Sequence, residues 1–433
     1  MTVPDPLRET QSPQETAQRF LQRLKEPSRI CVAVSGGSDS LGALLALHSA
    51  NAREQRHSLY AITVDHALRS EAAEEAIKVG EICHTLGIHH QIRRWTGEKP
   101  DSGLPAKARE ARYNLLREAA DGLGSSVLVT GHTLDDQAET IAMRRTRNDQ
   151  NNRGLSGMAE ATLYRRSLWI MRPFLATRRV AFRMLLLERN LSWIEDPSND
   201  NDRYERVQKR KAGVVADLAE LTRHAKARLE RSDKVARWIR GACRLEAGSI
   251  LRIKGDALHK DPETLVEAMS VLLAVMGGKA HLPPKTRVEQ MLTDLASEAM
   301  RRFTLSRTLV VAQPDEVWMM REKRGLLPLF LEPGEEKLWD GRFSIRNVTE
   351  AMGRIDPGPV EGAPAELPAP LKPSILSTWP HMILDNSLNQ SVKAATMEHF
   401  IPLIDNFLPS FDLVMAEALN DLFGREPLSA PPV

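Results

Sequence analysis

A strand–turn–helix junction near residue 35 constrains the fold of this chain more than any other feature of its sequence. The apolar run 30–34 predicts a buried strand, and the turn 35–40, rich in serine and glycine, leads into an apolar segment, 41–47, that predicts a helix. Such a junction gathers unpaired backbone N–H groups and the positive end of a helix dipole. It therefore suits an anion such as a phosphate group.

The residue types of this turn favour the same interpretation. Gly36 and Gly37 let an anion approach the backbone closely, and Ser35, Ser38 and Ser40 add hydroxyl donors. No lysine follows the glycines, so the turn is not a Walker-type phosphate loop. A connecting turn that binds no ligand is the alternative.

Asp39 within the turn argues against that alternative. A carboxylate repels a phosphate unless a cation lies between them, and Mg²⁺ commonly bridges carboxylate and phosphate oxygens. The sequence therefore predicts Mg²⁺ at Asp39. A favourable charge on the first turn of the helix would also explain this residue.

Composition places the chain among ordinary soluble proteins. It has 433 residues, enough for two to four domains, with 42% hydrophobic and 27% charged residues. Its apolar runs are too short to span a bilayer, and its N-terminus does not resemble a secretory signal. The three cysteines are scattered, without a CxxC pair, so a reducing, cytoplasmic compartment is expected. A net charge of +2 does not by itself identify a nucleic-acid binder.

Strand and helix patterns alternate through the first half of the chain. Strands are expected at 30–34, 59–64, 88–92 and 127–130, and helices at 13–24, about 70–86 and 106–122. This alternation predicts an α/β fold with a doubly wound parallel sheet and ligands at the carboxyl ends of its strands. The loops that begin at Ser35, Asp65 and Gly131 should therefore converge.

Three carboxylates gather in the stretch 131–140. If this stretch opens a helix, Asp135 and Asp136 share a face with Glu139. Clustered carboxylates repel one another unless a helix dipole, a metal or a bound cation compensates them. A capped helix N-terminus explains one such acid better than three. His132, in the preceding turn, could bind phosphate or carry a proton.

Two patterns that suggest metal sites fail. Cys83 with its neighbours His84, His89 and His90 matches no usual zinc spacing. The stretch 196–202 lacks the glycine and the glutamate of a calcium loop.

Four segments are expected along the chain. They are a lead-in (1–27), a catalytic domain (28–212), a basic helical connector with a small α+β domain (213–330), and a C-terminal domain (331–433). Within the last, 338–345 predicts one strand, and the Pro-rich stretch 356–373 predicts a linker or long loop rather than a packed element. Basic clusters, among them the pair at 178–179, suit a phosphate backbone, although a solvated face is the alternative.

The turn 35–40 resembles the SGGxDS loop of the PP-loop ATP pyrophosphatase superfamily, whose members cleave ATP to AMP and pyrophosphate while adenylylating a substrate oxygen. Further motifs at 64–69, 131–140, 154–158 and 195–199 together resemble the tRNA(Ile)-lysidine synthase family. The likeness is strong over 28–212. The remaining segments are similar to longer family members, which carry two C-terminal tRNA-binding domains, and this implies an acceptor-stem contact for 331–433.

The resemblance implies a reaction that joins free L-lysine to the wobble cytidine of an isoleucine tRNA with a CAU anticodon, with ATP and Mg²⁺. The implied catalytic residues are Asp39, His132, Asp136 and Arg206. ATP would be held by Ser35, Gly36, Gly37, Ser38, Asp39, Ser40, Val64 and His66, with Mg²⁺ at Asp39. The lysine and substrate pocket would comprise Arg109, Arg112, Asp135, Asp136 and Glu139. Contacts to tRNA would come from Arg144, Arg145, Arg147 and Arg210.

The chain departs from the family pattern in two places. Ala67 stands where members often have glycine, and the segment 206–210 keeps the arginines of the RNxxR pattern but not its asparagine.

Two alternative functions are considered. A PP-loop enzyme of tRNA thiolation is one alternative, although such enzymes typically need cysteines or an iron–sulfur cluster. A non-catalytic tRNA-binding protein is the other, and the intact Asp39, Asp136 and Glu139 count against it. The oligomeric state is left open, with a homodimer as one option.

Overall fold

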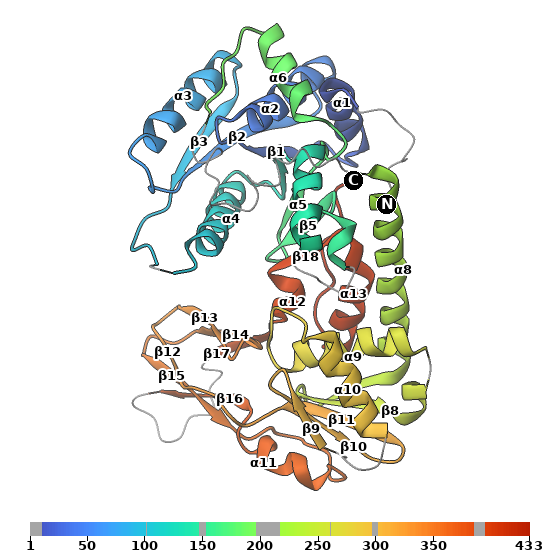
Figure 1. Ribbon diagram of the computed structural model, residues 1–433. Coiled ribbons are helices and arrows are strands. Elements are labelled where there is room, and N and C mark those ends of the chain that lie inside the picture. Colours follow the sequence, from blue (N-terminus) through green and yellow to red (C-terminus); the bar gives the residue numbers. More distant parts are fainter. Residues whose placement is uncertain are drawn as a thin grey trace. The chain divides into compact units, whose positions relative to one another are not determined.

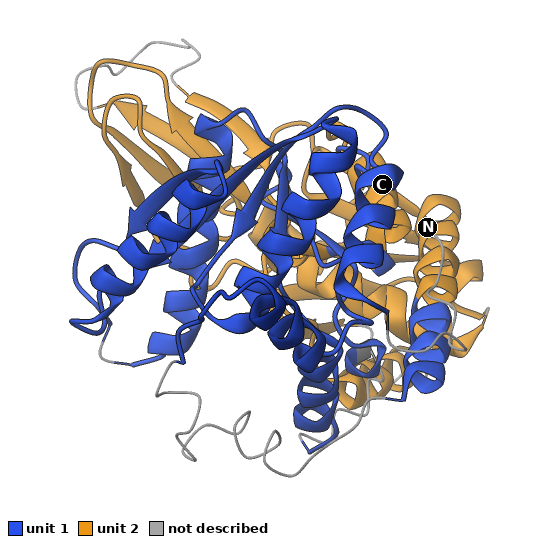
Figure 2. Ribbon diagram, turned by 90° about the horizontal axis from the view of Figure 1, so that it is seen from above, with its two compact units in different colours: residues 1–228, 409–411, 429–433 blue, residues 229–408, 412–428 orange. Residues whose placement is uncertain are grey.

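The computed structural model describes residues 11–100, 102–146, 153–195, 217–259, 261–296, 302–384 and 395–433. The chain divides into two compact units (Figure 2). The first contains residues 1–228, 409–411 and 429–433, and the second contains residues 229–408 and 412–428. The division falls within the long helix α8 (Leu218–Ala242). No helix in the described ranges is long and apolar enough to cross a membrane.

The first unit alternates strands and helices along the chain (Figure 1). Its elements are α1 (Pro13–Arg23), β1 (Arg29–Ala33), α2 (Ser38–Glu54), β2 (Ser58–Asp65), α3 (Ala72–Thr85), β3 (His89–Arg94), α4 (Leu104–Gly122), β4 (Val127–Thr130), α5 (Leu134–Thr146), β5 (Ala161–Tyr164), β6 (Leu168–Met171) and α6 (Arg179–Glu188). The predicted order of strands and helices up to residue 140 is confirmed. The β5–β6 hairpin and α6 were not predicted.

The main sheet has seven strands in the order β18-β5-β6-β4-β1-β2-β3, where β18 is Phe407–Pro409. Strand β1 lies between β4 and β2 and runs parallel to both. The pairs β2–β3 and β4–β6 are also parallel, whereas β5 runs antiparallel to β6. The predicted α/β fold with a largely parallel sheet is therefore confirmed.

A close contact between α2 and α6 fixes the helix that follows the serine–glycine turn. A Cβ on Gly42 would lie 2.6 Å from the Phe182 ring, so only glycine allows α6 to approach α2 this closely. The Phe182 ring also packs edge-to-face on Phe174. Because α6 begins at Arg179, this packing determines where the first turn of α6 lies.

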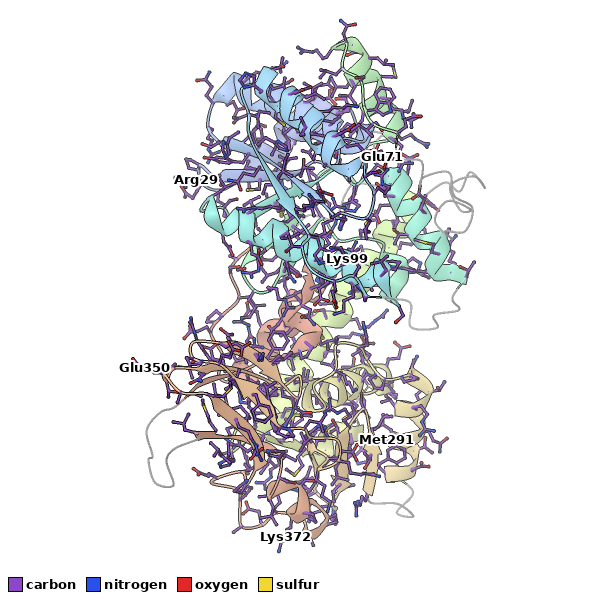
Figure 3. The ribbon with its side chains drawn as sticks, turned by 90° about the vertical axis from the view of Figure 1, so that its left-hand side faces the viewer. Arg29, Glu71, Lys99, Met291, Glu350 and Lys372 are labelled. Atoms are coloured by element: carbon purple, nitrogen blue, oxygen red, sulfur yellow. The ribbon has the colours of Figure 1, made fainter. Side chains whose placement is uncertain are left out.

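The second unit is mainly antiparallel. A five-stranded sheet has the order β7-β8-β11-β10-β9, and two three-stranded sheets have the orders β12-β15-β16 and β13-β14-β17. The strands are β7 (Cys243–Glu246), β8 (Ile250–Lys254), β9 (Arg302–Leu305), β10 (Thr308–Ala312), β11 (Glu316–Arg321), β12 (Leu329–Leu331), β13 (Glu336–Trp339), β14 (Phe343–Asn347), β15 (Gly353–Gly358), β16 (Trp379–Leu384) and β17 (Ala395–His399). The helices of this unit after α8 are α9 (Pro262–Met276), α10 (Lys285–Ala296), α11 (Lys372–Ile375), α12 (Pro402–Asp405) and α13 (Leu413–Leu422). Figure 3 draws the side chains that cover both units.

Two predictions for this unit were wrong. The stretch 338–345 is not one strand, because a turn with positive φ at Asp340 and Gly341 separates β13 from β14. The Pro-rich stretch 356–373 is not a linker, because three of its apolar side chains are buried in a core cluster with residues of the five-stranded sheet. These are Val360, Leu367 and Leu371. Prolines limit regular structure but do not prevent apolar neighbours from packing.

A buried ion cluster ties the β13–β14 turn to the five-stranded sheet. Asp340 accepts hydrogen bonds from Arg307, Arg321 and Arg342, and the side chains of Asp340 and Arg321 are almost fully buried. The Arg342 guanidinium also lies over the rings of Trp339 and Phe343. The cluster therefore holds together elements that the sequence had assigned to separate segments.

Candidate active site

The turn 35–40 is held by its own serines. Ser40 Oγ accepts the Ser35 N–H at 3.1 Å and donates to the Gly37 carbonyl at 3.1 Å. Gly37 is the N-cap residue of α2 and has no side chain with which to cap the helix, and no hydrogen bond to the N–H groups of residues 38–40 is found among the described residues. The first N–H groups of α2 are therefore available to a ligand, as an anion site requires.

The two glycines of the turn have different roles. Gly36 has a φ of +84°, and a Cβ at this position would lie 2.5 Å from the side chain of Ile194. The backbone N–H of Ile194 donates a hydrogen bond to the Gly36 carbonyl at 2.9 Å. Around Gly37 a Cβ would meet nothing closer than 3.8 Å. Gly36 thus allows the turn to pack, whereas Gly37 leaves space beside the backbone.

The turn that follows β4 touches the turn that follows β1. A Cβ on Gly131 would lie 2.5 Å from the backbone carbonyl oxygen of Asp39. The predicted convergence of the loops at Ser35 and Gly131 is therefore confirmed. Because β1 and β4 are parallel neighbours, both turns lie at the carboxyl edge of the sheet.

Thr133 and Asp136 form a capping box at the start of α5. The Thr133 N–H donates to Asp136 Oδ2 at 2.7 Å, and the Asp136 N–H donates to Thr133 Oγ1 at 3.3 Å. The capping role considered for these acids is thus real for Asp136. It uses one carboxylate oxygen and leaves Oδ1 directed at another partner.

That partner is Arg179, the first residue of α6. Its guanidinium donates to Asp39 Oδ2 at 2.8 Å, to Asp136 Oδ1 at 3.0 Å and to Glu139 Oε1 at 3.5 Å. Its backbone N–H donates to Asp135 Oδ2 at 2.8 Å. One residue therefore contacts all four predicted acids, three of them through the guanidinium.

The resulting cluster is largely buried, and its carboxylates outnumber its guanidinium groups among the described residues. The exposed fractions of the Arg179, Asp136 and Glu139 side chains are 16%, 7% and 4%. Among the described residues, three carboxylates face one guanidinium, before Asp135 is counted. A pair of unit charges 4 Å apart interacts by about 4 kcal/mol at an effective dielectric constant of 20, so further cations are attracted here.

The pKa values in the cluster follow from burial and from these contacts. Burial raises the pKa of Asp39, and the Arg179 guanidinium offsets part of that rise, whereas the nearby Asp136 adds to it. Burial alone would lower the pKa of Arg179, but the carboxylates, Asp39 above all, raise it beyond its ordinary value. Arg179 is therefore charged throughout the working pH range.

Sequence reasoning missed Arg179 because it placed the pair at 178–179 on a basic surface. The run Leu168–Met171 is apolar and short enough for a strand, and it forms β6, the parallel neighbour of β4. Had that strand been predicted, the rule that ligands gather at carboxyl ends would have brought the segment after it to this edge.

A second group of side chains lies at the carboxyl end of β2. His66 packs edge-to-face on Trp95, with 6.1 Å between ring centroids, and its Nδ1 is buried with no partner among the described residues. Burial lowers the pKa of His66, and the nearby Arg112 and Lys99 lower it further. A neutral imidazole with an unpaired nitrogen fits a polar group of a nucleotide.

The other predicted site residues have partners of different kinds. His132 Nδ1 lies 2.8 Å from the Thr130 hydroxyl, and the Arg109 guanidinium lies over the Tyr113 ring at 5.0 Å. Val64 is in β2, one residue before its last residue, Asp65.

The predicted tRNA contacts on α5 are partly used within the chain. Arg144 donates to the carbonyls of Gly154 and Gly157 at 2.6 and 3.0 Å, and Arg145 pairs with Glu220 at 2.5 Å. The motif 154–158 therefore owes its position to α5. The predicted site residues Arg147, Arg206 and Arg210 lie outside the described residues.

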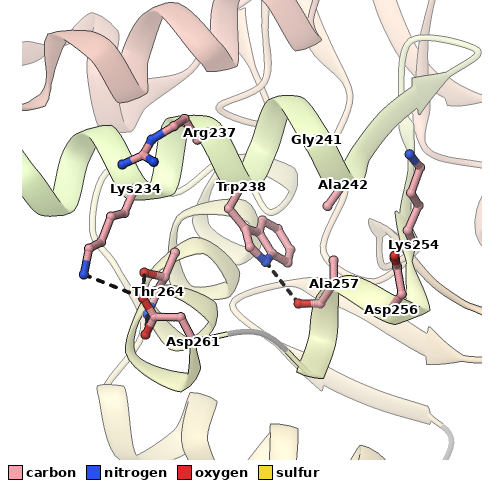
Figure 4. Close-up of a pocket in the computed structure, with 10 residues that line it drawn as sticks. All are labelled: Lys234, Arg237, Trp238, Gly241, Ala242, Lys254, Asp256, Ala257, Asp261 and Thr264. Atoms are coloured by element: carbon pink, nitrogen blue, oxygen red, sulfur yellow. Dashed lines mark hydrogen bonds and ion pairs between the residues drawn. The ribbon is translucent and has the colours of Figure 1, made fainter.

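A pocket of about 520 Å³ lies in the second unit, away in sequence from these motifs (Figure 4). Among the residues that line it, the indole N–H of Trp238 donates to the Ala257 carbonyl at 3.2 Å, and the Lys234 ammonium lies 3.7 Å from the Asp261 carboxylate. These groups already bind one another, so the pocket offers little unsatisfied chemistry.

Protein side chains alone do not form a metal site in the described ranges, where no group of three or more His, Cys, Asp or Glu could hold an ion. The three cysteines are unpaired, and burial raises the pKa of Cys31 and Cys83 to about 11 and that of Cys243 to about 12. Such thiols stay protonated, which disfavours the sulfur chemistry of the thiolation alternative.

The fold and the site define a class of enzyme. A largely parallel sheet with a serine–glycine turn after β1 suits a PP-loop domain, and the family model of that domain matches residues 9–214. Proteins of this class use ATP.

Comparison with curated proteins narrows the class. Three relatives named tRNA(Ile)-lysidine synthase come from Rhizobium meliloti (38% identical, 97% of both chains), Mesorhizobium japonicum (38%, 93% of both) and Brucella canis (32%, 92% of this chain and 94% of that one). The chain belongs to the tRNA(Ile)-lysidine synthase family, and it is an enzyme. A solved U34-tRNA thiolase, NcsA from Methanococcus maripaludis, matches with a TM-score of 0.41 and 18% identity over 49% of this chain and 76% of that one. That likeness is too low to bear on activity.

Proposed function

We propose that this enzyme joins free L-lysine to C2 of the wobble cytidine in an isoleucine tRNA with a CAU anticodon, and that it cleaves ATP to AMP and pyrophosphate. The observation that carries the proposal is the direct contact between the serine–glycine turn and the carboxylates of α5, through Gly131 and Arg179. A phosphate site and an acid pocket in contact suit a reaction that joins a nucleotide-activated base to an amine.

The ATP half of the site is proposed at the turn 35–40. The uncapped end of α2 and the space beside Gly37 suit the triphosphate, and the unpaired nitrogen of His66 suits the nucleoside. Mg²⁺ would be held by Asp39 together with ATP phosphates, because Mg²⁺ in proteins commonly takes one or two carboxylates plus phosphate oxygens. It would neutralise charge on the phosphates.

The lysine half is proposed at Asp135, Asp136 and Glu139. Three carboxylates face the single guanidinium of Arg179 among the described residues, and such an acidic surrounding suits the cationic side chain of lysine. Arg109, Arg112 and Arg206 are proposed to contact the substrates.

The reaction is proposed to proceed in two displacements. The cytidine O2 attacks the α-phosphate, and pyrophosphate leaves. The deprotonated ε-amine of lysine then attacks C2, and AMP leaves with the oxygen. The ammonium must lose a proton before it can attack, and His132 and Asp136 are the proposed proton acceptors.

The remaining predictions extend this proposal to the whole chain. Residues 28–212 would catalyse the reaction, and 213–330 and 331–433 would bind tRNA, with the acceptor stem assigned to the last segment. Contacts from Arg144, Arg145, Arg147 and Arg210 would meet the phosphate backbone. Its substrates and unpaired cysteines suit a cytoplasmic enzyme. A homodimer stays a prediction.

The test is incorporation of labelled lysine. Purified protein is incubated with ATP, Mg²⁺, labelled lysine and a transcript of isoleucine tRNA with a CAU anticodon, and label in the tRNA is measured. A transcript with the wobble cytidine replaced by uridine is the matched control. Label in the first transcript alone is expected; folded protein that labels neither would refute the proposal.

A further inference from the structure

The guanidinium of Arg179 has no part in the two displacements above, although it lies at the centre of the carboxylates. Its three nitrogens bind oxygens from two elements: Asp39, at the start of α2, and Asp136 and Glu139, on the first turns of α5. A third element, α6, supplies the arginine itself.

The position of this guanidinium is fixed by more than its ion pairs. Asp135 accepts the backbone N–H of Arg179 at 2.8 Å, and the Leu134 N–H donates to the Thr177 carbonyl at 2.9 Å. The start of α6 is thus bonded twice to the start of α5. The contact between Gly42 and Phe182 fixes α6 against α2.

Charge gives a reason for a cation at this point. ATP must bring several negative charges to a turn that already carries Asp39, with Asp136 nearby. Without a resident cation, the carboxylates would repel the triphosphate. A lysine could supply the charge but not the planar fork that reaches three oxygens at once.

We propose that Arg179 is a positioning residue for the ATP-dependent adenylylation of the tRNA. It holds the Asp39 carboxylate in register with Asp136 and Glu139, and it lowers the negative charge that ATP meets between them. This inference rests on the proposed function. Arg179 acts through the carboxylates and the charge they present.

A second role for Arg179 makes the opposite prediction. If the guanidinium only filled the place of the substrate ammonium, its removal would lower the KM for lysine and leave adenylylation unimpaired. The positioning role predicts instead that the defect appears with ATP, before lysine is needed.

The experiment separates the two half-reactions. Arg179→Ala, Arg179→Lys and Arg189→Ala are compared with the wild type for tRNA-dependent pyrophosphate release without lysine, at varied ATP, and for lysine transfer. Arg189 is exposed near the end of the same helix and serves as the control. We expect Arg179→Ala to lower the adenylylation rate about 100-fold and to raise the KM for ATP about 10-fold. Arg179→Lys should fall between it and the wild type, and Arg189→Ala should match the wild type.

Adding guanidinium ions to the Arg179→Ala variant tests whether the missing group itself supports pyrophosphate release. A purely structural role would not predict recovery of that rate. Partial recovery of pyrophosphate release by Arg179→Ala in guanidinium chloride, but not in sodium chloride of equal concentration, is expected. Thermal unfolding of each variant checks that it is folded.

The outcomes distinguish the two proposals. Wild-type protein that transfers no lysine refutes the proposed function itself. Active wild type together with folded Arg179 variants of unchanged adenylylation rate and KM for ATP overturns the positioning role. If Arg179→Ala does not fold, Arg179→Lys decides: wild-type kinetics overturn the role, and slow adenylylation by folded protein supports it.

Discussion

At the scale of single residues, ion pairs between the carboxylates and Arg179 define the site. Asp39 illustrates this, because it lies on the turn proposed to bind the phosphates of ATP and yet bonds to an arginine 140 residues further along the chain. Burial raises the pKa of Asp39, which means that the charged form of its carboxyl group is energetically disfavoured at this position. A carboxylate kept charged at a cost is a candidate for cation binding rather than for structure alone.

Asp39→Ala tests that conclusion. The change should lower tRNA-dependent AMP formation at least about 100-fold, because it removes the proposed magnesium ligand from the triphosphate. Binding of tRNA, measured by filter retention without ATP, should stay at the wild-type level. Loss of tRNA binding by folded protein would contradict the assignment of this turn to ATP.

At the scale of elements, the proposed function requires the contact between the turn after β1 and the turn after β4. Gly131→Ala would place a Cβ within 2.5 Å of the Asp39 carbonyl oxygen, a backbone atom that cannot turn aside. The turns must separate, and we expect a loss of about 1–3 kcal/mol in the free energy of unfolding together with slow adenylylation. Gly122→Ala, at the end of α4 with no atom within 4 Å, is the control. It should keep full activity; equal defects in both variants would show that the contact is unimportant.

The same elements show what sequence could and could not predict. The strands β1, β2 and β4 are apolar runs that end in a recognisable motif, so they followed from the sequence, and the parallel rule then placed Ser35 and Gly131 together. The two strands of the hairpin β5–β6 have four residues each, as β4 does, but neither is followed by such a motif. Arg179 follows that hairpin, so missing the strands meant missing the residue. The Pro-rich stretch misled because composition reports backbone preference, whereas the burial of Leu371 depends on a sheet far away in sequence.

At the scale of the whole molecule, the second unit carries its own response to pH. His399 packs among Phe343, Trp379 and Phe423, and burial, helped by Arg425 and Arg342, lowers its pKa to about 4. The unfolded chain takes up this proton near pH 6.5, and the folded chain only near pH 4. Between these two pH values the proton stabilises only the unfolded chain. The free energy of unfolding is therefore highest above pH 6.5 and decreases as the pH falls towards 4.

His399→Phe should remove this dependence. In urea unfolding followed between pH 7.5 and 4.5, the wild type should lose up to about 3 kcal/mol more than the variant. His281→Asn, a change at an exposed histidine of the same unit, should follow the wild type. If the free energy of unfolding changed with pH in the same way for the wild type and for His399→Phe, protonation of His399 would not be the cause of the pH dependence.

The long helix α8 joins the two units, and its basic side chains suit the proposed contact with tRNA phosphates. Most of its arginines already have partners: Arg237 pairs with Asp233, and Arg240 pairs with Asp421. Arg223 and Lys226 are exposed and lie one turn apart on the same face. These two are therefore better candidates for phosphate contacts than Arg144, whose guanidinium binds two carbonyls.

Replacing Arg223 and Lys226 together with alanine should weaken tRNA binding and flatten its salt dependence. Removing one cation that binds a phosphate lowers the slope of log K against log salt by about 0.9, so the slope of the double variant should fall by up to about 2. A charge-matched control, Arg53→Ala with Lys78→Ala, removes two exposed cations from α2 and α3, to which no tRNA contact is assigned. If both double variants kept the wild-type slope, α8 would be a connector alone; if the slope fell equally in both, net charge rather than this face would attract the tRNA.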